Sequence, residues 1–120
     1  MNVERTDFVS VLTQDIQRAK AFYAETLGLE IESEGESDME FRCGQVTLDV
    51  FDPSSIGQQF APSPAGLALR VPDVAAAREK LVEAGVEVGE MWDSGACEGA
   101  GLDDPAGNRI LLHRRYAPYE

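Results

Sequence analysis

The sequence predicts an α+β fold built from two modules, each with the order β-α-β-β-β. Three observations support this prediction. Two segments repeat the same order of strand, capping Asp, amphipathic helix, Gly and strand. The remaining segments alternate between apolar and polar residues, as half-buried strands do. A proline-rich stretch separates the two copies. We therefore expect one domain over residues 1–120, with module one at about 5–52, a linker at 53–65 and module two at about 66–116.

The first helix is predicted within "TQDIQRAKAFYAETLGLEI". Asp15 is a suitable N-cap, because a carboxylate accepts hydrogen bonds from the free N–H groups of the first turn. Gly28 suits the left-handed position that ends a helix. Between them runs an apolar stripe of Ile16, Ala19, Phe22, Tyr23 and Leu27.

The second helix is predicted within "VPDVAAAREKLVEAGVEV" by the same signals. Asp73 is its N-cap and Gly85 its end, and the apolar stripe is Val74, Ala77, Leu81 and Ala84. Two unrelated helices with similar caps would show the same pattern of Asp, apolar stripe and Gly. The matching order of all five features favours duplication.

The other segments are predicted as strands. The stretch "FVSVL" precedes the first helix, and "MEFRCGQVTLDVF" reads as a hairpin that turns near Cys43 and Gly44. "AGLALRV" precedes the second helix, and "VEVGEMWDS" and "GAGLDDPAGNRILLHRR" supply the last strands, with "DPAGN" as a turn. "DPSSIGQQFAPSPA" is the linker and a candidate lid.

The alternation of four strands separates two faces of side chains. One face is aliphatic, as expected under a helix. Its members are Val9, Val11, Val46, Leu48, Val50, Leu67, Leu69, Val71, Ile110 and Leu112. The other face mixes apolar and polar residues, which is what a small-molecule pocket needs. It could instead pack against another subunit. The candidate ligand-binding residues are Phe8, Ser10, Asp49, Phe51, Arg70, Trp92, Leu111 and His113.

Composition excludes several partner classes. The chain has 10 basic and 22 acidic residues, for a net charge of −12, whereas nucleic-acid binding needs a basic face. No apolar run reaches the length of a membrane helix, and no secretory signal precedes the first strand. Cys43 and Cys97 are isolated cysteines, which predicts free thiols and a cytoplasmic protein. The acidic run "EIESEGESDME" is interpreted as a solvated surface; a site for a cationic partner is the alternative.

Paired modules with these motifs resemble the vicinal oxygen chelate superfamily, which includes glyoxalase I, extradiol dioxygenases and bleomycin-resistance proteins. The resemblance is carried by "LTQDIQRAKAFYAETLGL", "LRVPDVAAAREKLVEAGVEV" and "DDPAGNRILL", and covers nearly the whole chain. It implies a cupped, barrel-like mixed sheet made by two modules, and a homodimer.

The chain departs from the resemblance at the metal-ligand positions. Members of the superfamily that are enzymes place one ligand seven residues before the capping Asp, which is Phe8 here and Gly66 in the second copy. Another ligand lies four residues after the Gly of the "DPxG" turn, at Leu111. These side chains have no donor atoms, and Asp49 with the single histidine, His113, gives two donors at most. A catalytic zinc typically needs three. We therefore expect no metal and no cofactor.

Three functions follow from these observations. The first is a metal-independent protein that sequesters a small planar or cationic compound such as an antibiotic, with Trp92 as an aromatic contact. Trp92 could equally be a core or dimer-interface anchor. The alternative is an enzyme of the same fold (lyase, isomerase or dioxygenase-like) acting on a small organic substrate through Asp49 and other pocket groups. A domain that serves only protein interaction is the third.

Overall fold

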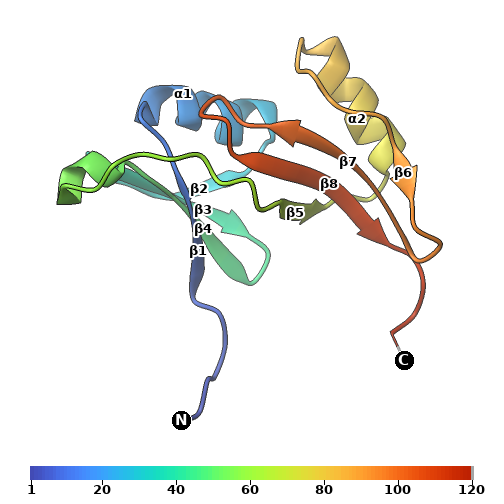
Figure 1. Cartoon of the computed structure of the whole chain (residues 1–120), viewed down its shortest axis with the longest axis horizontal. Coiled ribbons are helices and arrows are strands. Elements are labelled where there is room, and N and C mark those ends of the chain that lie inside the picture. Colours follow the sequence, from blue (N-terminus) through green and yellow to red (C-terminus); the bar gives the residue numbers. More distant parts are fainter. Residues whose placement is uncertain (120) are drawn as a thin grey trace. The chain divides into compact units, whose positions relative to one another are not determined.

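The computed structural model describes residues 1–119 and confirms the α+β class. It contains two four-stranded sheets, each mixing parallel and antiparallel neighbours. The chain divides into two compact units, Met1–Ser63 and a second that begins at Pro64. Each unit holds one sheet and one helical segment packed on it (Figure 1).

The first unit has the order strand, helix, three strands and a short 3₁₀ helix. Its elements are β1 (Phe8–Leu12), α1 (Ile16–Lys20), η1 (Ala21–Thr26), β2 (Glu30–Glu34), β3 (Asp38–Cys43), β4 (Val46–Phe51) and η2 (Pro53–Ile56). The strand order in the sheet is β1-β4-β3-β2, with β1 parallel to β4 and the other pairs antiparallel. This arrangement leaves β1 and β2 as the two edges.

The capping residues of the first helix act as predicted. The Asp15 carboxylate accepts from the backbone N–H of Arg18 at 3.1 Å, and Gly28 has a φ of 76°. The second half of this helix, η1, has the wider π-helical turn, which the apolar stripe did not predict. Tyr23 in η1 is fully buried, and its ring packs against the rings of Phe22 and Phe41.

The core of the first unit lies between the helix and one face of the sheet. Its buried apolar side chains are Val11, Ala19, Phe22, Tyr23, Met39, Phe41, Leu48 and Val50. Val9, which alternation placed on the same face, is 36% exposed. It lies in the edge strand β1, which has a sheet neighbour on one side only. The aliphatic face was therefore predicted correctly except at its margin.

The second unit repeats the order strand, helix and strands. Its elements are β5 (Leu67–Arg70), α2 (Val74–Glu83), β6 (Trp92–Asp93), β7 (Cys97–Asp103) and β8 (Arg109–Arg115). The strand order is β5-β8-β7-β6, with β5 parallel to β8. Helix α2 packs on β7 and β8 (Figure 1). The buried apolar residues are Val74, Leu81, Ala100, Leu102, Ile110 and Leu112.

The predicted turn "DPAGN" connects β7 to β8. The Asp104 carboxylate accepts from the backbone N–H groups of Ala106 and Asn108 and from the Asn108 side chain, at 2.8–2.9 Å. Both Asp104 and Asn108 are buried, so these hydrogen bonds satisfy groups that would otherwise be costly to bury.

Two predictions about the second unit need correction. The strand expected over "VEVGEMWDS" is limited to Trp92 and Asp93. Before it, the Gly89 N–H still donates to the Gly101 carbonyl of β7 at 2.8 Å, but the carbonyls of Val88 and Gly89 accept from the Arg78 guanidinium, and no regular strand forms. Ala84, assigned to the apolar stripe, is exposed because the helix ends at Glu83.

The linker between the predicted modules also differs in detail from the expectation. It contains the 3₁₀ helix η2, capped by Asp52, whose carboxylate accepts from the Ser54 N–H at 3.0 Å. The rest, up to Gly66, has no helix or strand. Among residues 1–119, no helix is both long and apolar enough to cross a membrane.

The capping of α2 gives a stability prediction. The Asp73 carboxylate accepts from the backbone N–H of Ala76 at 3.0 Å. Asp73→Ala removes this acceptor and is expected to lower the free energy of unfolding by about 1 kcal/mol. Asp73→Asn is the matched control and should cost a few tenths, because Asn caps equally well. Urea denaturation at pH 7 measures both; an Ala variant as stable as the wild type would contradict the assigned cap.

Candidate functional site

The face of the first sheet that lies opposite its helix carries the predicted site residues of the first unit. Cross-strand register places Ser10 of β1 beside Asp49 of β4, and Asp49 beside Glu40 of β3. The next row along the strands pairs Phe8 with Thr47. The alternation used to define this face is thus confirmed.

Asp49 is the polar centre of this face. One carboxylate oxygen, Oδ2, accepts from the Ser10 hydroxyl at 3.3 Å. The other, Oδ1, is shielded from solvent and has no hydrogen-bond partner within the described part of the chain. Burial is the largest of the effects that raise the pKa of Asp49 to about 6. The Asp38 carboxyl, with which protonated Asp49 can share a hydrogen bond, and the charges of Asp38 and Glu40 also raise this pKa, whereas the Ser10 hydrogen bond lowers it.

The two neighbouring carboxylates were missed as site residues. The sequence interpretation treated "EIESEGESDME" as a solvated surface, and Asp38 and Glu40 belong to that run. Hairpin register carries the signal that would have found them. With the turn at Gly44 and Gln45, Cys43 lies opposite Val46, and the same register brings Glu40 to Asp49.

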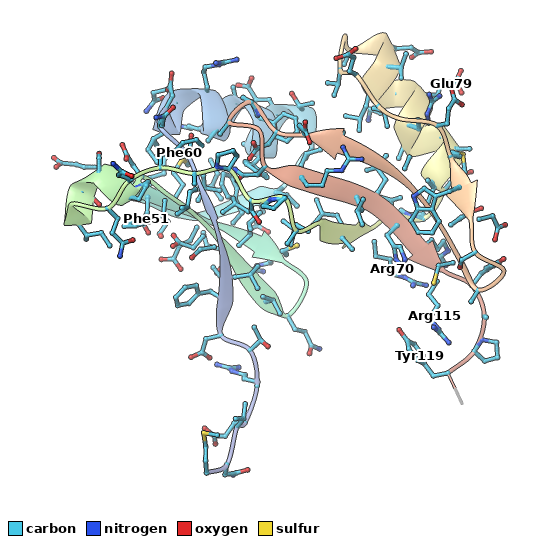
Figure 2. All side chains as sticks on the ribbon, in the orientation of Figure 1. Phe51, Phe60, Arg70, Glu79, Arg115 and Tyr119 are labelled. Atoms are coloured by element: carbon cyan, nitrogen blue, oxygen red, sulfur yellow. The ribbon has the colours of Figure 1, made fainter. Side chains whose placement is uncertain are left out.

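Aromatic residues border the acidic centre. Phe51 is partly buried in β4, beside Leu12 of β1 and Asp38 of β3 (Figure 2). Phe8 is 58% exposed at the start of β1. This face therefore offers apolar side chains around a cluster of negative charge, which favours a ligand group that is apolar, cationic or both.

The corresponding face of the second sheet holds three of the other predicted site residues, Trp92, His113 and Arg70, in one row. Register places Trp92 of β6 beside Gly99 of β7, Gly99 beside His113 of β8, and His113 beside Arg70 of β5. The rings of Trp92 and His113 have centroids 6.0 Å apart and are tilted by 51°. Trp92 is 41% exposed. The row thus combines an accessible aromatic surface with a cationic side chain.

Two glycines of β7 that were not among the predicted site residues shape this face: Gly99 lies in the row, and Gly101 lies beside Leu111. A Cβ at Gly99 would lie 2.6 Å from Cζ2 of Trp92, so the indole lies directly over the bare backbone there. A Cβ at Gly101 would collide with the Arg109 guanidinium, which lies over that position. Glycine inside a predicted strand commonly marks such a close approach, and "EGAGLD" was the available signal.

Arg70 and Arg115 lie at the same end of the sheet, near Tyr119 (Figure 2). Arg70 donates to the backbone carbonyl of Arg115 at 3.3 Å. Arg115 donates to the carbonyls of Ala117 and Pro118, and its guanidinium lies 3.9 Å from the centre of the Tyr119 ring. Arg115 is therefore engaged with the end of the chain, whereas Arg70 makes a single hydrogen bond at the edge of the row.

Leu111, the remaining predicted residue, packs near Gly66. A Cβ at Gly66 would lie 2.9 Å from Leu111 Cδ1. These two residues and Phe8 occupy the positions at which the resemblance implies metal ligands, and none offers a donor atom. Among residues 1–119, no three His, Cys, Asp or Glu side chains are grouped so that they could hold a metal ion. The donor set does not fit a divalent ion.

The structure therefore gathers the predicted residues into two groups, one per unit. Phe8, Ser10, Asp49 and Phe51 share the open face of the first sheet. Arg70, Trp92, Leu111 and His113 share that of the second. Their contact with a ligand stays a prediction.

Comparison with known protein families gives one match. A model described as the Glyoxalase/Bleomycin resistance protein/Dioxygenase superfamily matches residues 5–112. None of the curated proteins matches the chain.

Solved structures with the same fold include proteins of different described roles. A putative glyoxalase family protein from Bacillus anthracis is 25% identical, with a TM-score of 0.83 over 97% of this chain and 98% of that one. TnmS3, an antibiotic binding protein from Streptomyces sp. CB03234, is 27% identical, with a TM-score of 0.81 over 97% and 99%. A lactoylglutathione lyase from Agrobacterium tumefaciens, 21% identical, covers 94% and 95% with a TM-score of 0.78 and shows the shared fold alone.

The raised pKa of Asp49 gives a prediction about pH dependence. The folded-state pKa of about 6 exceeds the unfolded value of about 4. Between these values the folded state binds more protons, so the contribution of Asp49 to the free energy of unfolding falls as pH rises. Asp49→Asn lacks this contribution and should gain stability relative to the wild type from pH 4 to pH 7. Urea denaturation of both proteins at the two pH values measures the difference.

Neighbouring substitutions give the controls. Ser10→Ala should raise the pKa of Asp49 further and Asp38→Asn should lower it, as read from the carboxyl carbon by NMR. If wild type and Asp49→Asn show the same pH dependence, the carboxyl is not perturbed as described.

Proposed function

This chain belongs to the Glyoxalase/Bleomycin resistance protein/Dioxygenase superfamily, and we propose that it binds a small planar organic compound without a metal ion and without transforming it. The sequestered compound would be of the antibiotic type. The principal contact would come from the open sheet face of the second unit, through Trp92.

The accessible aromatic surface of Trp92 is the observation that carries this proposal. A large side chain that only stabilised the fold would be expected in the core, yet Trp92 is 41% exposed and lies over Gly99. Its ring adjoins His113 on a sheet face that α2 does not cover. Flat aromatic surfaces with nearby polar groups favour the stacking of planar ligands.

The similarity to an antibiotic binding protein supports the same function. TnmS3 is 27% identical over 97% of this chain. A second Streptomyces structure, described as a glyoxalase/bleomycin resistance protein, is 28% identical over 92%. Metal independence is supported by residue chemistry: Phe8, Gly66 and Leu111 have no atoms that can ligate a cation.

An enzyme remains the second candidate, because of Asp49. Its pKa of about 6 lies close to that of a useful general base, and Oδ1 has no hydrogen-bond partner among the described residues. An acid–base reaction on a small organic substrate would use this carboxyl with Ser10 as its orienting donor. Its polar neighbours in the described part of the chain include the Ser10 hydroxyl and the carboxyls of Asp38 and Glu40.

We further propose a cytoplasmic homodimer. Cys43 and Cys97 are both free thiols, as in reducing compartments. Phe8 and Val9 are 58% and 36% exposed on the edge strand β1, which is typical of surfaces that associate.

Light scattering on the purified protein is expected to give the mass of two chains. A single-chain mass at about 100 μM would exclude the dimer.

Trp92 makes the main proposal directly testable, since it is the only tryptophan. Saturable quenching of its fluorescence is expected with at least one member of a library of planar aromatic compounds. By calorimetry, Trp92→Leu should weaken that binding roughly tenfold, because stacking is lost. Met91→Ala, which changes the exposed apolar neighbour in sequence, should leave the affinity unchanged.

Two controls separate the alternatives. The titration midpoint should be the same in EDTA; loss of binding in EDTA would overturn metal independence. Chromatography of the bound compound after incubation should recover it unchanged. A product whose formation Asp49→Asn abolishes would favour the enzyme, and a library without any quencher would contradict small-molecule binding.

A further inference from the structure

We propose that the row Trp92–Gly99–His113–Arg70 in the second unit binds the planar aromatic part of an organic anion, with the ring on Trp92 and a carboxylate on Arg70. This inference rests on the proposed function and specifies the class of ligand. The net charge of the protein favours a cationic compound, whereas the charge of this row favours an anionic one.

The ring-binding half of the row is held in a fixed shape. Cross-strand register brings Trp92, Gly99 and His113 together on three adjacent strands. The bare backbone at Gly99 makes room for the indole, since a Cβ there would lie 2.6 Å from Cζ2 of Trp92. The indole is 41% exposed and adjoins the tilted His113 ring, so part of its aromatic surface is accessible.

The anion-binding half is Arg70, whose charge is not compensated. A guanidinium has five N–H donors, and the structure assigns Arg70 one hydrogen bond, to the Arg115 carbonyl at 3.3 Å. None of the ion pairs found among residues 1–119 includes Arg70. In a chain with 22 acidic and 10 basic residues, Arg70 therefore keeps an uncompensated charge on this face.

Two other arginines of this unit show the contrast, whereas Arg114, like Arg70, makes a single hydrogen bond within the described residues, to the Val71 carbonyl at 3.4 Å. Arg109 pairs with Asp103 at 3.4 Å, and Arg78 binds two backbone carbonyls and lies 4.0 Å from Glu90. Both are satisfied within the unit. Arg70 is exposed, so its remaining donors can form the bidentate pair that a carboxylate favours.

The carboxylates near the row are directed elsewhere. Asp93 follows Trp92 in β6, and alternation places it on the opposite side of the strand. It accepts from the Tyr116 hydroxyl at 2.6 Å and from the Gly95 N–H at 2.8 Å. Glu98 pairs in register with Asp93 and Arg114, outside the row. A negative ligand on this row therefore meets Arg70 without a carboxylate in the same row.

Three probes of one shape test the charge preference: 2-naphthoate, 2-naphthylmethanol and 2-naphthylmethylammonium. Calorimetry at pH 7.5 should show 2-naphthoate binding roughly tenfold more tightly than the neutral alcohol, and the ammonium more weakly than either. Arg70→Gln should remove the advantage of the acid while the alcohol still binds, which also shows that the variant is folded.

A matched variant controls for net charge. Lys80→Gln makes the same charge change on the exposed side of α2, and it should leave the preference for 2-naphthoate intact. Trp92→Leu should weaken all three probes together.

The outcomes distinguish the inference from the function on which it rests. Equal binding of acid and alcohol, or an acid preference that Arg70→Gln preserves, would overturn the anion site and leave small-molecule binding standing. Tightest binding of the ammonium would overturn it in favour of a cationic ligand at Asp49. If none of the three probes binds and the aromatic library gives no quenching, both the inference and the proposed function fail.

Discussion

In each unit one helical segment packs on a sheet that has two faces, and this imbalance determines which strand side chains stay accessible. In the first unit the helix seals the face that holds Phe41 and Leu48. In the second, α2 seals the face that holds Ile110 and Leu112. Side chains alternate along a strand. When an aliphatic residue packs under a helix, the next residue in the strand must therefore point to the open face. The side chains of the open faces are therefore placed by the core, although they are not part of it.

The architecture was largely predictable because it depends on short-range signals. Capping by Asp15 and Asp73 and left-handed glycines at the helix ends are local features, and the structure shows both caps. Alternation within strands is local as well, which is why the two faces were separated correctly. The short strand β6 was less predictable, because Arg78, from another element, takes the carbonyls of Val88 and Gly89.

The candidate sites were predicted only in part because they depend on cross-strand partners. Asp49 was identified from its own strand, but its perturbation comes from Asp38 and Glu40 in the neighbouring strand. Trp92 was identified as an aromatic contact, but its orientation is set by the absence of a side chain at Gly99. Register joins residues that are distant in sequence, and alternation in one strand gives no information about it.

The open face of the first sheet carries carboxyl groups, and that of the second carries the Arg70 guanidinium. The two kinds of group differ in how their charge can be neutralised. On the first sheet, Asp49 lies among carboxylates, and its pKa rises to about 6. Taking up a proton removes both the cost of burying a charged carboxylate and the repulsion from its neighbours. On the second sheet, Arg70 has no comparable relief, since a guanidinium stays charged at any physiological pH. Its charge has to be met by solvent or by an anion. On the first face, proton uptake by Asp49 can therefore remove the uncompensated charge, whereas on the second face only a group from outside the protein can do so.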